Sequence, residues 1–355
     1  MMKWRALAAA TVVLVAVGTP AGPALARAGC FDRSTEPYTS VVDSHVHLRP
    51  FGGRGIPLTE MGDYWRRTGV RYVNIYGIGQ ILPTDSPCTY YLECPGTPVL
   101  PSMKNDVDNV RDAMQTKIDG VRLTLSMTFP DLANPAGIVD GMRTLDEAYP
   151  GQFSWMGEVN LIKQALLPNN AEPAALDDIA AWWPFMDELR RRDIPITIHS
   201  DLGNDAEPLK YLYLMEAVLA LYPNNKIVWA HMGLSEQLTT IAPDRHIDTL
   251  RRLMDRYPKL YLDIAWRVLE DNCFCNEPTR EQYVPFLNEY SSRIIPGTDF
   301  VASRKKNFST YQEELDVTSK INKFLSDNAF REIALGQSYF DLLGLPDEAP
   351  PICAA

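Results

Sequence analysis

The sequence predicts an α/β fold, a (β/α)8 TIM barrel, from three observations. Eight short, apolar and β-rich segments recur along the chain, segments with helical patterning separate them, and successive β-rich segments begin at intervals of roughly 30 to 50 residues. A strand, a helix and two loops occupy about this length. Alternation of strands and helices indicates a parallel sheet, and eight such units close into a barrel.

The predicted strands are bounded by turn-forming residues. They lie at Val41–His47, Arg71–Tyr76, Gly120–Ser126, Ser154–Asn160, Pro195–Ser200, Lys226–His231, Lys259–Ile264 and Arg293–Thr298. The competing fold is a doubly wound open sheet, which usually has a glycine-rich phosphate loop after its first strand. Here residues Arg49–Gly55 follow the first strand without the dinucleotide-binding spacing, so the barrel is favoured.

The segments between the strands show apolar residues at helical spacing. Helices are predicted over Asp106–Lys117, Leu176–Arg192 and Glu207–Leu221, and a closing helix near Phe330–Leu343. The second of these ends on three arginines, as the helix dipole prefers.

The first 26 residues have the pattern of a secretory signal peptide. Lys3 and Arg5 precede the apolar run Ala6–Gly18, and Ala24-Leu25-Ala26 supplies the small residues of a cleavage site. The run is too short for a permanent membrane span. We therefore expect a mature barrel domain over residues 27–355, secreted or periplasmic, with no membrane attachment after cleavage.

Cysteine usage agrees with export. The six cysteines are Cys30, Cys88, Cys94, Cys273, Cys275 and Cys353. An even count in an exported chain suggests disulfides, and Cys88 and Cys94 flank a short loop as the simplest pair. Cys273 and Cys275 are too close to bond each other comfortably, so each is expected to pair elsewhere. A cysteine-based zinc site is disfavoured, because no second Cys-x-x-Cys partner exists.

Composition restricts the class of partner. Hydrophobic residues make up 46% and charged residues 22% of the chain, as in an ordinary globular domain. The net charge of −11 argues against nucleic acid, since binding phosphate needs a basic face. We expect a small-molecule substrate. The sequence leaves open whether the chain is a monomer or a homo-oligomer.

Two histidines on the first predicted strand are the first chemical signal. His45 and His47 are two residues apart, so on a strand both imidazoles face the same side. Imidazole is a good ligand for zinc and similar metals, and two on one rigid strand form half of a metal site. Alone, the pair is also compatible with core or solvated histidines.

Four further polar residues stand at or near the ends of predicted strands, where barrel enzymes place catalytic groups. They are Glu158, His199, His231 and Asp299. Singly, each has an ordinary structural explanation: a satisfied core histidine, a helix cap, or a carboxylate paired with a basic residue. Together they would be a costly polar interior unless a bound cation compensates them, so a metal site is predicted. The fifth histidine, His246, lies in a polar helix start and is expected at the surface.

These residues carry a family resemblance. Asp43–His47, His199, His231 and Gly297–Phe300 resemble the amidohydrolase superfamily, and within it the group that contains the aminocarboxymuconate-semialdehyde decarboxylase-like proteins. The ending Ile333–Leu345 resembles that group's closing helix. The resemblance covers most of residues 41 to 345.

The resemblance implies a divalent metal, zinc or alternatively manganese, as one or two ions. His45, His47 and Asp299 would hold it, with His199 a ligand and His231 a ligand or a polarising acid. Relatives with two metals use a carboxylated lysine or a glutamate as a bridge on the fourth strand, where this chain has Glu158. Single-metal relatives usually lack such a residue, and the sequence leaves the number of ions open.

The predicted reaction is hydrolysis of an amide, ester, lactone or phosphoester by metal-activated water. Asp299 would transfer the proton, and His231 or a second metal would polarise the substrate oxygen. The alternatives are a single-metal decarboxylase and a non-catalytic metal-binding barrel. The loop residues Tyr90, Tyr91, Trp266 and Arg267 are interpreted either as an aromatic, partly cationic mouth of the site or as ordinary packing.

Overall fold

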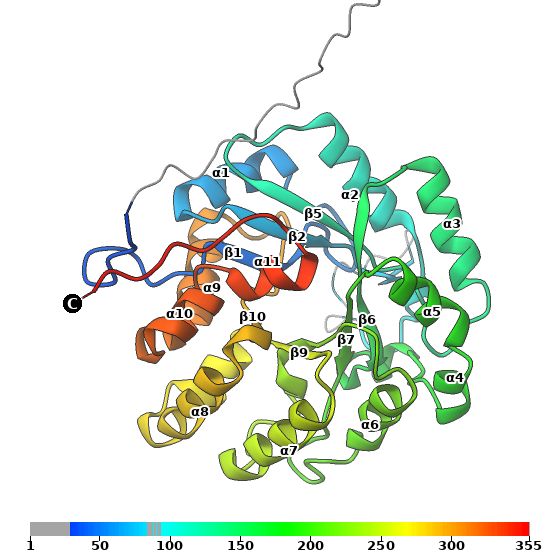
Figure 1. Ribbon diagram of the computed structural model, residues 1–355. Helices are drawn as coiled ribbons and strands as arrows, with labels where there is room; N and C mark the ends of the chain where they lie inside the picture. The colour runs from blue at the N-terminus through cyan, green and yellow to red at the C-terminus, as the bar shows by residue number, and fades with distance from the viewer. Residues whose placement is uncertain (1–28, 84–87, 89, 91–93, 355) are drawn as a thin grey trace, which may run out of the picture.

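The computed structural model describes residues 29–83, 88, 90 and 94–354, and over these residues the chain forms a parallel barrel ringed by helices (Figure 1). The strand order is β10-β9-β8-β7-β6-β5-β2-β1-β11. Because β10 and β11 are consecutive halves of the eighth strand, pairing of β11 with β1 and of β10 with β9 closes the barrel. The predicted signal peptide lies outside the described residues.

All eight predicted strands are present and parallel. They are β1 (Val42–His47), β2 (Tyr72–Tyr76), β5 (Arg122–Met127), β6 (Phe153–Ile162), β7 (Ile196–Ser200), β8 (Ile227–Trp229), β9 (Leu260–Asp263) and the pair β10 (Ile294–Ile295) and β11 (Phe300–Val301). A small antiparallel hairpin, β3 (Gln80–Ile81) and β4 (Leu100–Pro101), lies in the long segment after β2. Strands buried on both faces explain the near-continuous apolar runs in the sequence.

Most of the helices lie around the outside of the barrel, and α11 lies across one end of it (Figure 1). The α-helices are α1 (Leu58–Thr68), α2 (Lys104–Gln115), α3 (Ile138–Ala148), α4 (Leu176–Ala180), α5 (Trp183–Arg191), α6 (Leu212–Leu221), α7 (Pro243–Arg256), α8 (Glu277–Glu289), α9 (Phe308–Ser319), α10 (Asp327–Ile333) and α11 (Gln337–Leu343). Four short 3₁₀ helices are described: η2 (Gln164–Asn169), η3 (Ala230–Gly233), η5 (Ser291–Arg293) and η6 (Lys320–Phe324). The segment η4 (Glu270–Phe274) is a π-helix. No helix of the described residues has the length and hydropathy of a membrane span.

Two predicted helices are interrupted. The segment Leu176–Arg192 forms α4 and α5 with a break at residues 181–182, and the closing segment Phe330–Leu343 spans α10 and α11. The second break has a physical cause, because Gly336 has a φ of +88°, outside the helical region. The third predicted helix, Glu207–Leu221, begins later, at Leu212.

The last helix, α11, closes the end of the barrel at which the strands begin (Figure 1). Tyr339 donates its hydroxyl hydrogen bond to Thr124 on β5 at 2.9 Å, and Ser338 donates to the carbonyl of Ile294 on β10 at 2.7 Å. The ring of Tyr339 also stacks on Trp155 of β6. The opposite end, where the strands finish, is therefore the end open to a ligand.

The cysteine predictions are partly confirmed. Cys88 and Cys94 form the expected disulfide, and Cys30 forms a second one with Cys353. Cys273 and Cys275 have free thiols, so the expectation that each pairs elsewhere is wrong. The reason is spatial: Cys273 is buried within η4, Cys275 is exposed just after it, and the other four cysteines pair with one another.

The expectation for His246 is also wrong. Its side chain is completely buried, and its ring nitrogens contact the Tyr283 hydroxyl at 2.7 Å and the Met232 carbonyl at 2.9 Å. Although polar residues precede it in sequence, His246 lies on the face of α7 that packs inward with Ile247 and Leu250. Whether a helical residue is buried depends on the face of the helix on which it lies, and not on the polarity of the residues next to it in sequence.

Candidate metal centre

The six predicted side chains converge at the open end of the barrel. His45 and His47 come from β1, Glu158 from β6, His199 from β7, His231 from η3 directly after β8, and Asp299 from the break between β10 and β11. They form three overlapping groups whose nitrogen or oxygen ligand atoms lie within 4.8 Å of one another: His45, His231 and Asp299; His45, His47 and Glu158; and Glu158, His199 and His231. The sequence thus identified residues that share one place in the fold.

Glu158 lies between two pairs of histidines. Its Oε2 atom is 3.3 Å from Nε2 of His47 and 3.8 Å from Nε2 of His45. Its Oε1 atom is 2.5 Å from Nδ1 of His199 and 3.9 Å from Nε2 of His231. Each carboxylate oxygen therefore faces a different pair of imidazoles.

Asp299 faces the same space from the eighth strand. Its Oδ1 atom is 3.4 Å from Nε2 of His45 and 3.3 Å from Nε2 of His47, and its Oδ2 atom is 4.0 Å from Nε2 of His231. Both Asp299 and His231 have a φ of +55°, a conformation that non-glycine residues rarely adopt. The amide of Asp299 donates to the His45 carbonyl at 2.8 Å, which holds this turn against β1.

The remaining nitrogen of each imidazole is held away from the centre. The Nδ1 atom of His47 contacts the Gly77 carbonyl at 2.7 Å. The Nδ1 atom of His231 contacts the Ala265 carbonyl at 3.1 Å. Carboxylates hold the other two rings: Asp263 contacts Nδ1 of His45 at 2.9 Å, and Asp201 contacts Nε2 of His199 at 2.9 Å. If these outer nitrogens carry the proton, the inner ones present lone pairs to the centre, as histidine ligands of metals do.

The buried carboxylates and imidazoles of the centre shift one another's pKa values. Burial opposes ionisation of Asp299, yet its contact with His47 and the nearby charges of His45 and His231 hold the pKa of the Asp299 carboxyl below its usual range. Burial likewise lowers the pKa of His45, but contact with Asp263 and the nearby carboxylates outweigh it and raise that pKa to about 10. Because a metal ion binds only neutral imidazole, it would displace this proton on binding.

Two buried imidazole nitrogens indicate that the centre can accommodate a cation. Among the residues that the structure describes, Nε2 of His45 and Nε2 of His231 have no hydrogen-bond partner, and both side chains are fully buried. A buried polar atom left without a partner is costly, and native interiors nearly always satisfy it. Both atoms face Glu158 and Asp299, so a divalent cation among these donors would satisfy them. The donor set of imidazoles and carboxylates suits zinc and manganese.

Sequence reasoning missed two residues that belong to this centre. Asp263 ends β9; its Oδ2 atom contacts His45, and its Oδ1 atom accepts the backbone N–H of His231 at 2.6 Å. The signal was present, because an aspartate ends an apolar strand here as the other site residues do. Lys163, which is 3.3 Å from Oε1 of Glu158, follows the long strand β6 and had no comparable signal.

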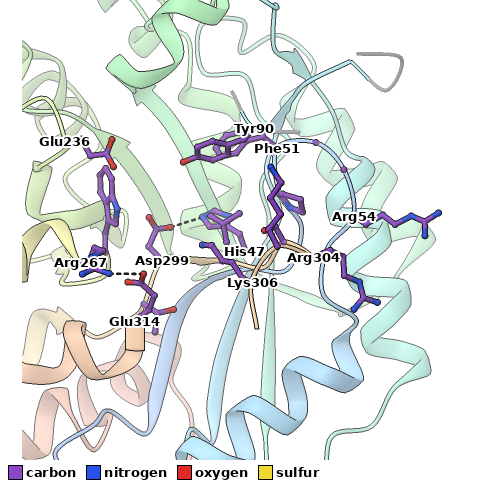
Figure 2. Close-up of a pocket in the computed structure, with 18 of the residues that line it drawn as sticks. His47, Phe51, Arg54, Tyr90, Glu236, Arg267, Asp299, Arg304, Lys306 and Glu314 are labelled. Atoms are coloured by element: carbon purple, nitrogen blue, oxygen red, sulfur yellow. Dashed lines mark hydrogen bonds and ion pairs between the residues drawn. The ribbon is translucent and has the colours of Figure 1, made fainter. Parts of the chain in front are cut away.

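A cavity of about 480 Å³ opens above the centre (Figure 2). His47 and Asp299 line it, together with Tyr90, Trp266 and Arg267, which supports the interpretation of these loop residues as an aromatic, partly cationic mouth. Tyr91 lies outside the described residues. The volume is within the range of about 300–1,000 Å³ typical of small-molecule sites.

Solved structures of low sequence identity share the fold. A dihydroorotase from Campylobacter jejuni is 15% identical, with a TM-score of 0.52 over 87% of this chain and 84% of that one. A dihydroorotase from Saccharomyces cerevisiae, in complex with 5-fluoroorotic acid, is 11% identical, with a TM-score of 0.52 over 89% and 86%. An amidohydrolase from Burkholderia multivorans with bound zinc is 13% identical, with a TM-score of 0.55 over 86% and 99%. A search against curated proteins gives no match.

The family assignment comes from the sequence model of the amidohydrolases. That model matches residues 109–333, which is more than half of the chain and includes Glu158, His199, His231 and Asp299. The match, the barrel and the polar centre at its open end agree with one another. The chain therefore belongs to the amidohydrolase family, and it is an enzyme of the metal-dependent hydrolase type.

Proposed function

We propose that this enzyme hydrolyses an amide, ester, lactone or phosphoester at a centre of two divalent metal ions bridged by Glu158. The observation that carries the proposal is the placement of Glu158, with Oε2 toward His45 and His47 and Oε1 toward His199 and His231. One carboxylate oxygen would thus be available to each of two ions.

The residues divide into two ligand sets around the bridge. His45, His47 and Asp299 would hold one ion, and His199 and His231 would hold the other. When bound, such ions lower the pKa of a coordinated water toward about 7 and polarise the oxygen of the bond that is cleaved. We propose zinc as the ion, with manganese as the alternative that the same donors accept.

Asp299 is the proposed proton-transfer residue. It lines the cavity, and its side chain is more accessible than those of the histidines, with 14% exposed against 0% for His45. Its lowered pKa keeps the carboxylate ionised at neutral pH, so it can accept the proton of the attacking water. The protonated carboxyl would then pass that proton to the leaving group.

His231 is proposed to hold the second ion or, where that ion is absent, to polarise the substrate oxygen itself. Trp266 packs edge-on against its ring, with ring centroids 5.1 Å apart, and Asp263 fixes its backbone. The imidazole is therefore held in one orientation below the cavity. A group held in one orientation can polarise a substrate oxygen without reorganising during the reaction.

One contact favours a second candidate with a single ion. Lys163 lies 3.3 Å from Oε1 of Glu158, and this ammonium neutralises part of the charge that a second ion would need. A single-metal centre would suit the decarboxylase alternative. The non-catalytic barrel is disfavoured, because the chain belongs to an enzyme family.

Metal stoichiometry separates the two candidates. The wild-type protein, loaded with excess zinc and then desalted, should retain two equivalents by elemental analysis, and Glu158→Gln should retain one. Glu172→Gln, at an exposed position, is the matched control and should retain two. A wild-type protein that never exceeds one equivalent would refute the bridged centre and favour the single-metal candidate.

We also propose that the enzyme acts outside the cytoplasm after removal of residues 1–26. The disulfides Cys30–Cys353 and Cys88–Cys94 support this, because such bonds persist in oxidising compartments. Mass spectrometry of the exported protein tests the proposal. It should show a start near Arg27 and two free thiols, whereas an intact Met1 or six free thiols would contradict it.

A further inference from the structure

The cavity above the centre is lined by more cations than carboxylates, although the whole chain has a net charge of −11. The lining cations are Arg54, Lys163, Arg267, Arg304, Lys305 and Lys306. The lining carboxylates are Glu236, Asp299 and Glu314. A locally positive cavity in an acidic protein attracts small anions.

Several of these cations already have carboxylate partners. Lys163 contacts Glu158, and Arg304 contacts Glu60 at 3.0 Å. Arg267 contacts Asp271 at 2.9 Å and Glu314 at 3.4 Å. Their charges are therefore largely compensated within the protein.

Lys306 differs from them. Within the part of the chain that the structure describes, no carboxylate lies within 4.0 Å of its ammonium, which instead sits 4.7 Å from the centroid of the Phe300 ring. The side chain is half-buried. Figure 2 shows it reaching toward the same part of the cavity as Asp299 and His47, whereas Arg54 points away.

The environment of Lys306 leaves its charge in need of a partner. Burial lowers the pKa of the Lys306 ammonium, and the more distant charges of Glu314 and Asp299 only partly offset this. A half-buried cation without an ion pair gains most from an anion that enters with the substrate.

Aromatic side chains complete the cavity. Phe51 and Tyr90 meet edge to face, with ring centroids 5.7 Å apart, and Figure 2 shows the two rings together on one side of the cavity. Trp266 lines the cavity beside His231. Such surfaces favour a flat or cyclic group over a flexible polar chain.

From these contacts we propose that the substrate is a ring-containing carboxylate whose carboxylate binds Lys306 while the bond to be cleaved lies at the metal centre. This inference rests on the proposed function, because it places the reacting bond at that centre. A carboxylate is favoured over a phosphate, because a phosphate has more charge and more acceptor oxygens than a single ammonium can match.

Two metal-chelating probes test the inference without hydrolysis. Benzohydroxamic acid and 3-carboxybenzohydroxamic acid bind metal through the same group and differ only in the carboxylate. In calorimetry with zinc-loaded wild-type protein, the carboxylated probe should bind at least about tenfold more tightly, as expected for one charge-assisted contact. Lys306→Met should abolish this difference and leave the affinity for benzohydroxamic acid unchanged, and Lys306→Arg should retain most of it.

Lys323→Met is the matched control, because Lys323 also places its ammonium over an aromatic ring, that of Tyr38 at 4.0 Å, but does not line the cavity. This variant removes the same charge and should keep the full difference between the probes. Equal affinity of the two probes for the wild type, or a preference that survives in Lys306→Met, would overturn the inference.

A separate ligand distinguishes failure of this inference from failure of the metal centre. Benzene-1,3-dicarboxylate, measured against its neutral diamide on protein treated with a chelator, reports the Lys306 contact alone. If neither hydroxamate binds zinc-treated protein, the metal centre fails. A dicarboxylate preference lost in Lys306→Met would then still support the carboxylate contact, and its absence from the wild type would refute it.

Discussion

Single buried residues decide how the centre is held. Asp263 uses one oxygen for the ring of His45 and the other for the backbone N–H of His231, so one carboxylate orients two proposed ligands. Contacts with these histidines hold the pKa of the Asp263 carboxyl below its usual range, although burial opposes this. An ionised carboxylate behind a ligand histidine raises the basicity of that histidine toward a metal.

The buried His246 should make the free energy of unfolding depend on pH. Burial lowers the pKa of its imidazole from 6.5 to about 4, so the neutral ring is the native form. Between these two values the unfolded chain binds the proton and the folded chain does not, and the free energy of unfolding therefore falls as the pH falls. The contribution of His246 is complete above about pH 6.5 and decreases by about 3 kcal/mol toward pH 4.

The measurement compares urea unfolding of the wild type and of His246→Gln from pH 7.5 to pH 4. Glutamine does not titrate, and its amide keeps a donor for the Met232 carbonyl. The stability difference between the two proteins should shrink or reverse as the pH falls. A difference that stays constant over this range would show that His246 does not titrate as described.

At the residue scale, the sequence predicted which polar side chains meet at the open end of the barrel better than it predicted their surroundings. His45, His47, His199 and His231 were found because histidines at the ends of apolar strands are unusual. His246 was misplaced because its sequence neighbours are polar, whereas burial depends on the helix face. The contact of Lys163 with Glu158 could not be predicted, because a lysine that follows a strand carries no sequence pattern that identifies its carboxylate partner.

The eighth strand is the element that brings Asp299 to the centre. Residues 296–299 leave the strand between β10 and β11, and Thr298 is held there by Asp43 of β1, which accepts both its N–H and its hydroxyl at 2.9 Å. Tyr311 of α9 donates to the same carboxylate at 2.9 Å. This break directs the Asp299 side chain into the cavity instead of along the sheet.

Gly297 makes that break possible and gives a second prediction. A Cβ atom there would lie 2.8 Å from Cβ of His45 and 3.1 Å from Cβ of Ala265, and neither atom can move without its backbone. Gly297→Ala should lower the free energy of unfolding by about 1–3 kcal/mol, the usual cost of overpacking. Because His45 is displaced, the variant should also retain less metal.

Chemical denaturation and elemental analysis measure both effects. Gly29→Ala is the control, since a Cβ there meets nothing within 4 Å. Unchanged stability and full metal content in Gly297→Ala would contradict the role given to this glycine.

At the element scale, strands were easier to predict than helix ends. All eight strands were recognised because each is an apolar run between turn residues. The interruption of the eighth strand was not foreseen, because it depends on Asp43 and Tyr311, which are distant in sequence. The breaks in the helices depend on local conformations such as that of Gly336, which periodicity does not reveal.

At the scale of the whole molecule, a disulfide ties the first and last described segments of the chain together. The Cys30–Cys353 disulfide links residues 323 positions apart, and beside it Phe31 pairs with Ile352 and packs against Phe330 of α10. Because α10 packs against α11, which closes the end of the barrel opposite the centre, this link stabilises the fold away from the reacting groups.

The two disulfides should therefore differ in their contribution to stability. A crosslink that closes a longer loop removes more entropy from the unfolded chain, which by loop entropy amounts to about 5–6 kcal/mol for Cys30–Cys353 and about 2 kcal/mol for Cys88–Cys94, only six positions apart. The Cys30→Ser/Cys353→Ser variant should lose more stability in denaturant unfolding than Cys88→Ser/Cys94→Ser. Metal content of the folded protein should stay at the wild-type level in the first variant. A short-loop variant that loses as much stability as the long-loop variant would contradict the entropic explanation, and loss of metal from the long-loop variant would show that the chain ends reach the centre.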